Sequence, residues 1–167
     1  MDELTLSEVN ELSDAAFVDT LGSIYETSPW VAERALTDRP FDSSDELREA
    51  MKDVVENATD DKKLALLRAH PNLGEQTEMT DASEKEQASA GLDQLSPKQY
   101  ETFQRLNERY EEKFEFPFIM AVKNESPDAI QQAMEQRIEH SESAEFETAL
   151  REVHEIARLR IDELITA

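Results

Sequence analysis

Helix-start signals recur along the whole chain, and they constrain the fold more than any other feature of the sequence. At each start a serine stands before a helical segment, and most of these segments carry apolar residues three or four positions apart. The serines are Ser13, Ser28, Ser43, Ser83, Ser96 and Ser126. Further helices are expected over about 60 to 69 and about 143 to 165. With only three glycines in 167 residues, the sequence predicts an all-α fold, a single-domain bundle of about eight helices over residues 1–167.

Two stretches lack the helical pattern. Residues 71–82 (PNLGEQTEMTDA) form the longest irregular stretch and lie between two predicted helices. The run FPFIMAV, residues 116–122, is apolar and partly β-branched, which also suits a strand. Because a single strand would have no partner in a helical protein, we interpret this run as a buried extended connection.

The charge of the chain excludes one class of partner. Acidic residues number 39 and basic residues 17, which gives a net charge of −22. A field of this sign repels phosphate backbones, so we expect no nucleic-acid partner. The acidic residues alternate with apolar ones and so form a solvated surface. We interpret this surface as an adaptation to high salt, in which ions screen the self-repulsion.

Membrane and metal chemistry are also disfavoured. No apolar run approaches the roughly 18 residues of a membrane span, and the N-terminus (MDELTLSEVN) has no apolar signal core. We therefore expect a cytoplasmic protein with no membrane partner. The chain has no cysteine, which excludes disulfides, a thiolate nucleophile and cysteine-bound metals. Its three histidines lack the spacing of a helical metal motif, so no metal site is expected.

His70 is the first candidate for chemistry. It stands at a predicted helix end, before Pro71, and faces the longest irregular stretch. An imidazole in this place commonly caps the last carbonyls of a helix. It can also act as a general acid or base, because it titrates near neutral pH.

Ser83 and Glu86, followed by Gln87, form an S-x-x-E pattern. This spacing is the ordinary capping box of a helix start, and that is the simpler interpretation. A helix N-terminus also presents free N–H groups and the positive end of the helix dipole, which suits an anionic ligand. On a chain this acidic, such a ligand needs local positive potential inside its site.

Arg160 is unusual for its place in the last predicted helix. At 100° per residue it falls within about 40° of Phe146 and Leu164, which belong to the apolar stripe of this helix. A guanidinium on the core-facing side is rarely unpaired. Arg160 therefore requires either a buried carboxylate partner or a polar ligand.

Taken together, seven stretches resemble the family of 2-oxo-4-hydroxy-4-carboxy-5-ureidoimidazoline (OHCU) decarboxylases. They occur in the family's order over most of the chain: SPWVAERA (28–35), RPF (39–41), LLRAHPNLG (66–74), SEKEQASAGLDQLS (83–96), LNERY (106–110), FEFPFIMAVK (114–123) and ALREVHEIARLRI (149–161). The resemblance implies an all-α enzyme without a cofactor, often a homodimer. It also implies conversion of OHCU, a small anionic substrate, to S-allantoin in urate degradation.

The resemblance also assigns roles to individual residues. It implies that His70 is the essential acid/base and that Glu86 completes the catalytic pair. The substrate contacts that it implies are Pro71, Ser83, Gln87, Phe118, Ile119 and Arg160. The sequence departs from the family's pattern at Asn72 and Gly74, which shift a loop charge and loosen a turn, and at Glu115, where the family has a glycine able to adopt positive φ.

Two alternatives remain open at this point. A non-catalytic acidic helical binding module would use His70 and Glu86 as caps and Arg160 in a buried pair. Another ureide-processing lyase would keep the fold and change the reaction. The enzyme hypothesis requires the imidazole, the carboxylate and the guanidinium to converge on one small cavity.

Overall fold

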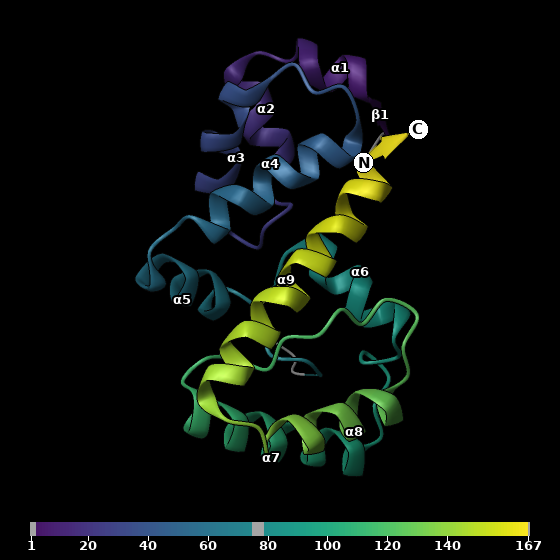
Figure 1. Ribbon diagram of the computed structural model, residues 1–167. Helices are drawn as coiled ribbons and strands as arrows, with labels where there is room; N and C mark the ends of the chain where they lie inside the picture. The colour runs from purple at the N-terminus through teal and green to yellow at the C-terminus, as the bar shows by residue number, and fades with distance from the viewer. Residues whose placement is uncertain (1–2, 75–78, 167) are drawn as a thin grey trace. The chain divides into compact units, whose positions relative to one another are not determined.

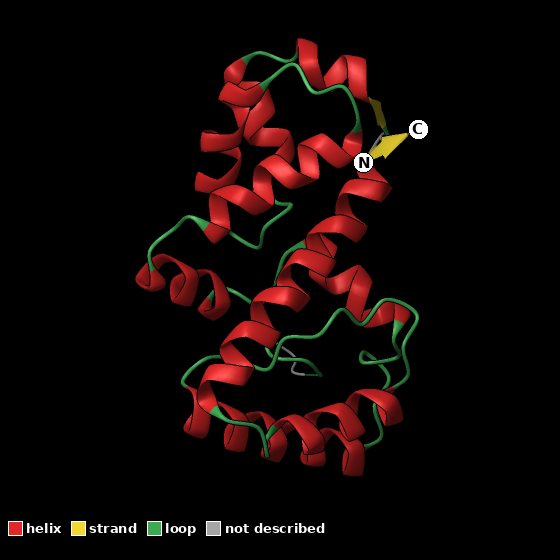
Figure 2. Cartoon of the chain, in the orientation of Figure 1, coloured by secondary structure: helices red, strands yellow, loops and turns green. Residues whose placement is uncertain are grey.

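The computed structural model describes residues 3–74 and 79–166, and helices dominate this part of the chain (Figures 1 and 2). The α-helices are α1 Leu6–Glu11, α2 Asp14–Leu21, α3 Trp30–Ala35, α4 Ser44–Glu56, α5 Asp60–Arg68, α6 Asp81–Ser89, α7 Pro97–Phe114, α8 Pro127–Arg137 and α9 Glu142–Leu164. A 3-10 helix, Leu36–Asp38, follows α3. The predicted all-α class is confirmed, with nine α-helices among the described residues.

The chain forms two compact units, each with its own core. Unit 1 comprises Met1–Ala69 with His154–Ala167, and unit 2 comprises His70–Val153. The last part of α9 therefore belongs to unit 1 and its first part to unit 2. The single-domain description of residues 1–167 stays a prediction.

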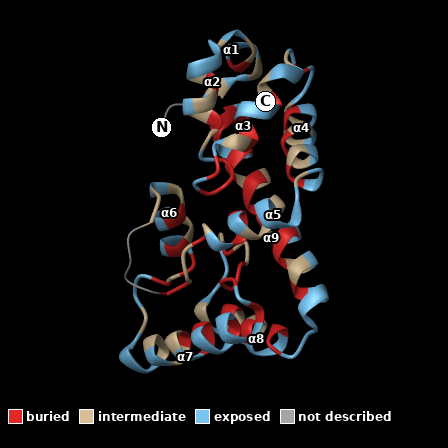
Figure 3. Cartoon of the chain, turned by 90° about the vertical axis from the view of Figure 1, so that its left-hand side faces the viewer, coloured by how far each residue is buried: buried red, intermediate tan, exposed pale blue. Residues whose placement is uncertain are grey.

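Unit 1 is built from α1 to α5 and the end of α9. Helix α3 packs against α4 and α2, and the buried faces of these helices carry the core, drawn red in Figure 3. A short parallel sheet joins the ends of the chain, because β1, Leu4–Thr5, pairs with β2, Ile165–Thr166. The sequence pattern predicted neither this sheet nor α1, although Thr5 and Glu8 form a capping box there.

Unit 2 is built from α6 to α8, the first part of α9 and two long irregular segments. Its core contains an aromatic cluster in which the Tyr110 ring lies 4.5 Å from Phe114, 5.8 Å from Phe116 and 5.4 Å from Phe118, between centroids. Residues 116–122 contain no regular structure, and Phe116, Phe118, Ile119 and Val122 are buried. The interpretation of this run as a buried extended connection is confirmed.

Most of the predicted helix starts are confirmed. Ser13, Ser43, Ser96 and Ser126 each accept a hydrogen bond from the backbone N–H three residues on. In the part of the chain that the structure describes, no helix is long and apolar enough to cross a membrane.

Two predicted helix starts were wrong. Ser28 does not cap α3, because its hydroxyl donates to the carbonyl of Glu26 at 2.8 Å. Ser83 does not open α6, which begins two residues earlier, at Asp81, with Thr80 as its N-cap. The Thr80 side chain accepts from the Ser83 N–H at 3.2 Å, so Ser83 lies inside the first turn.

The two departures from the family's pattern take a definite form. Glu115 ends α7 in the left-handed region, with φ 65° and ψ 21°, so a residue with a Cβ occupies the conformation that favours glycine. Gly74 has φ +78°, and a Cβ there would lie 3.0 Å from Leu95 Cδ1. A residue with a Cβ would therefore be strained at this turn, and the expectation that Gly74 loosens it stays a prediction.

Candidate active site

His70 lies two residues beyond the end of α5 and directly before Pro71. Thr59 caps the start of this helix, and Ala69 is its C-cap. The His-Pro pair therefore ends the helix, as predicted. His70 is 8% exposed, so the imidazole is largely removed from water while keeping a small accessible surface. A histidine in such a place can exchange a proton with a bound molecule.

The segment that follows His70 is fixed by two buried amide side chains. Gln87 Oε1 accepts from the Gly74 N–H at 3.0 Å, and Gln87 Nε2 donates to the Asn72 carbonyl at 3.3 Å. Asn107 Nδ2 donates to the Leu73 carbonyl at 2.9 Å. Three consecutive residues after the His-Pro pair are thus held by side chains, and we call Gln87 and Asn107 the amide clamp.

Helix α6 presents the other predicted residues. Ser83 and Gln87 are four positions apart, so they share one face of the helix, and they are 4% and 7% exposed. Glu86 is three positions beyond Ser83 and is half-buried. Ser83, Glu86 and Gln87 therefore form one polar face near the start of α6, where the helix dipole favours a negative charge.

The hydrogen bonds of Gln87 to the loop limit the bonds that its side chain can make to a ligand. Both ends of its amide already bond to the loop backbone. Oε1 retains one lone pair and Nε2 one hydrogen. Its role as a substrate contact stays a prediction. The structure gives Gln87 a second role, because its side chain holds residues 70–74, which we call the His70 loop.

Phe118 and Ile119 lie in the extended connection and are 0% and 2% exposed. The Ile119 carbonyl accepts from Arg137 Nη1 at 2.6 Å, and the Ala121 N–H donates to Glu152 Oε1 at 3.1 Å. The guanidinium carbon of Arg137 lies 4.4 Å from the centroid of the Phe118 ring. Charged side chains from α8 and α9 therefore replace the hydrogen bonds that a sheet would supply.

A buried carboxylate anchors Arg137. Glu145, 0% exposed, accepts from Arg137 Nε at 2.8 Å and from the Tyr110 hydroxyl at 2.5 Å. His140 Nδ1 lies 3.0 Å from its second oxygen. Burial, with the hydrogen bond to Glu145, raises the pKa of Tyr110 well above its usual value. The phenol therefore stays protonated and donates to Glu145.

Arg160 lies on the core-facing side of α9, as predicted, and is 7% exposed. Its Nη2 donates to Glu26 Oε2 at 3.1 Å, and its Nη1 donates to the Ser23 carbonyl at 3.0 Å. Glu26 is 2% exposed. The structure thus supplies a carboxylate partner, one of the two possibilities that the sequence left open, in the segment before α3.

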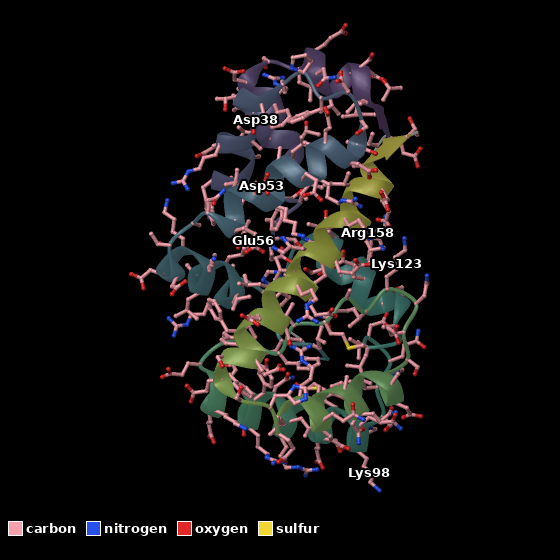
Figure 4. All side chains as sticks on the ribbon, viewed as in Figure 1. Asp38, Asp53, Glu56, Lys98, Lys123 and Arg158 are labelled. Atoms are coloured by element: carbon pink, nitrogen blue, oxygen red, sulfur yellow. The ribbon has the colours of Figure 1, made fainter. Side chains whose placement is uncertain are left out.

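The sequence analysis missed a second polar network in unit 1, which runs from the buried Tyr25 through His154 to the exposed Glu56. The Tyr25 hydroxyl lies 2.8 Å from His154 Nδ1, and His154 Nε2 lies 2.9 Å from Glu56 Oε1. Glu56 is labelled near the end of α4 in Figure 4. Burial lowers the pKa of His154, although the bond to Glu56 opposes this effect. Burial also raises the pKa of Tyr25.

The predicted site residues divide between the two units. Unit 2 holds seven of the eight: His70, Pro71, Ser83, Glu86, Gln87, Phe118 and Ile119. Arg160 belongs to unit 1. The bonds of Gln87 link the α6 face directly to the His70 loop. The convergence of Arg160 on the same cavity stays a prediction.

A surface hollow of about 660 Å³ lies beside the amide clamp and is lined by Gly74, Gln87, Leu92, Leu95 and Tyr100, among others. Neither His70 nor Glu86 lines it, so this hollow differs from the predicted catalytic site. Among the described residues, no three His, Asp or Glu side chains are grouped as metal ligands.

The missed residues share a signal that the sequence does carry. Asn107 is four positions after Phe103 on the buried face of α7, and Arg137 is three positions after Met134 on that of α8. Both are polar residues on an apolar stripe, the same feature that singled out Arg160.

Comparison with known proteins gives these residues a context. The family model described as OHCU decarboxylase matches residues 10–162. A 2-oxo-4-hydroxy-4-carboxy-5-ureidoimidazoline decarboxylase of Haloferax volcanii is 69% identical over 163 residues, 98% of this chain and 97% of that protein. The protein of the same name from Halalkalicoccus jeotgali is 59% identical over 164 residues, 98% of this chain and 93% of that protein.

The fold agrees with these sequence relationships. The crystal structure of an (S)-allantoin synthase superimposes with a TM-score of 0.80 and 32% sequence identity, covering 97% of this chain and 54% of that one. Sequence, fold and the order of the motifs lead to one conclusion: the chain belongs to the OHCU decarboxylase family.

Proposed function

We propose that this protein is a carboxy-lyase that converts OHCU to S-allantoin in urate degradation without a cofactor. The observation that carries the proposal is the 69% identity to an OHCU decarboxylase over 98% of the chain. All of the residues that the family resemblance assigns to the reaction are present in the sequence, including His70, Glu86 and Arg160.

The reaction determines what the site must supply. The bond between the ring carbon and the carboxylate breaks, carbon dioxide leaves, and the electron pair remains on the ring. The imine and carbonyl system of the substrate accepts this pair, and a proton must then be delivered to one face of the ring. The protein contributes position, electrostatic stabilisation and proton transfer.

His70 is the group that moves the proton in this proposal. It exchanges a proton with the hydroxyl of the substrate or with the carbanion, and delivery to one face sets the configuration of allantoin. Its burial and the amide clamp support this role, because a fixed imidazole transfers a proton to a defined place. Such proton transfer contributes about 10²–10⁴ in rate.

The remaining residues bind and orient the substrate. Arg160 and the N-terminal turn of α6 with Ser83 hold the anionic and carbonyl oxygens, while Glu86 and Gln87 orient the ureido group and the hydroxyl. The dipole of α6 supports the binding of an anion there. Pro71, Phe118 and Ile119 form the wall of the pocket. Glu86 also disfavours the ground state by placing a negative charge near the departing carboxylate.

The proposal extends to the setting of the enzyme. We place it in the cytoplasm as a homodimer, with a small anionic substrate and no nucleic-acid or membrane partner. The net charge of −22 supports adaptation to high salt, because ions screen its self-repulsion. Thermal unfolding in rising concentrations of KCl tests this point, and a Tm that does not rise with salt would refute it.

The decisive experiment follows freshly generated OHCU by the loss of its absorbance, with chiral analysis of the product. The proposal predicts rapid consumption and S-allantoin in the presence of a chelator. A non-catalytic binding module leaves the spontaneous rate unchanged, and a different ureide-processing lyase gives another product. Either result would overturn the proposal.

A further inference from the structure

The extended connection at residues 116–122 needs an explanation, because it is buried without belonging to a sheet. A buried backbone must satisfy its N–H and C=O groups. In this segment the Ile119 carbonyl bonds to Arg137 and the Ala121 N–H bonds to Glu152. The position of Phe118 and Ile119 thus depends on charged side chains that arrive from neighbouring helices.

Arg137 makes three different contacts that fix it against this segment. Its Nη1 donates to Ile119 at 2.6 Å, its Nε donates to Glu145 at 2.8 Å, and its guanidinium covers the Phe118 ring at 4.4 Å. A planar guanidinium can make these contacts together, whereas a lysine ammonium is a compact charge that cannot. Arg137 is 8% exposed and Glu145 is 0% exposed, so both are held in place by packing.

We propose that Arg137, anchored by Glu145, is a positioning residue that holds Phe118 and Ile119 in the geometry that binds the substrate. This inference rests on the proposed function, in which these two residues form the wall of the pocket. Arg137 itself does not touch the reacting atoms in this account. It acts on binding, whereas the amide clamp separately holds the residues that follow His70 and Pro71.

The separation of the two supports gives a specific kinetic signature. In Arg137→Lys the Ile119 carbonyl loses the guanidinium as its donor. We therefore expect the segment 116–122, and with it the pocket wall, to shift. We expect KM for OHCU and Kd for (S)-allantoin to rise about ten- to a hundredfold, because a displaced pocket wall fits either molecule less well. We expect kcat to fall less than about threefold, because the His70 loop keeps its own bonds.

A second variant and a control make the test independent of folding. Glu145→Gln keeps the shape of the anchor and removes its charge, so we expect a smaller rise in KM and Kd. Val55→Ala removes two methyl groups from the core of unit 1, where Val55 is 0% exposed, without touching this network. It should lower Tm while leaving KM and Kd unchanged.

The proposed function and the positioning role of Arg137 fail by different results. Failure of the wild-type protein to consume OHCU overturns the proposed function and this inference with it. With an active wild type, a rise in KM and Kd in either folded variant of the network supports the positioning role. If these variants lower Tm as Val55→Ala does, with KM and Kd unchanged, Arg137 and Glu145 are only structural and the inference is wrong.

Discussion

Polar side chains in both units hold irregular backbone, but the segments they hold differ. Side chains also pair with one another in both units, as Glu145 does with Arg137 and Glu26 with Arg160. In unit 1, Asn10 bonds to the backbone of Phe41, which lies outside the predicted site. In unit 2, Gln87, Asn107 and Arg137 bond to the segment that follows His70 and to the segment that contains Phe118 and Ile119. The comparison indicates that such bonds serve stability in unit 1, while in unit 2 they also hold segments at or beside predicted site residues.

The largest effect on stability is expected from the pair in unit 1. Glu26→Ala leaves the Arg160 guanidinium, which is 7% exposed, without its buried carboxylate. Removing one partner of a buried ion pair costs about 3–5 kcal/mol of unfolding free energy. Urea denaturation measures this loss.

Glu155→Ala is the matched control for that experiment. Glu155 pairs with Arg158, which Figure 4 labels on the same helix, and the two side chains are 41% and 37% exposed. We expect a change below about 1 kcal/mol. Equal losses in the two variants would contradict the account of Glu26.

The amide clamp provides the most direct comparison between the units. Asn107→Ala leaves the buried Leu73 carbonyl without its donor, which costs about 1–3 kcal/mol and frees the segment that follows His70. We expect kcat for OHCU to fall about tenfold or more, because the imidazole loses its fixed position. Steady-state kinetics far below the Tm measures this effect.

Asn10 in unit 1 is the matched control for Asn107, because it is also an asparagine that bonds to loop backbone. Asn10 makes two bonds of 2.9 Å with the backbone of Phe41, so Asn10→Ala should also lower stability. It should leave kcat unchanged. A kcat that falls equally in both variants would show that loss of stability, rather than loop position, controls activity.

The sequence predicted the helices better than the site for a physical reason. Helix starts such as Ser96-Pro97 depend on neighbours within four residues, so the pattern contains them. Thr80 and Ser83 both offer a cap within TDASEKE, and local pattern alone could not choose between them. The core-facing place of Arg160 followed from periodicity, but its partner Glu26 is 134 residues away in sequence and no local pattern could identify it.

A smaller effect on the unfolding free energy is expected from backbone strain at Glu115 in unit 2. Glu115 has φ 65° at the end of α7, where a glycine would be unstrained. Glu115→Gly should therefore raise the unfolding free energy by about 1 kcal/mol. Asn124, with φ 64°, serves as the comparison, because asparagine tolerates this region and Asn124→Gly should gain less. A larger gain at Asn124 would refute the strain argument.

The smallest effect concerns pH and unit 1. Burial lowers the pKa of His154 below its usual value of 6.5, so the fold favours the neutral imidazole. The unfolded chain then binds the extra proton more readily, and stability is lost as pH falls below about 6.5 through the folded pKa. In His154→Gln this part of the loss should be absent. If the unfolding free energies of wild type and variant fall in parallel between pH 7 and pH 5, the role given to His154 is wrong.

The most direct test of the whole account is the turnover of freshly generated OHCU by the wild-type protein and by His70→Asn at one salt concentration. We expect decarboxylation to S-allantoin by the wild type. For His70→Asn we expect a loss of at least about 10²-fold in kcat, with an unchanged circular dichroism spectrum. A folded His70→Asn protein with near-normal turnover would contradict the central role of this histidine.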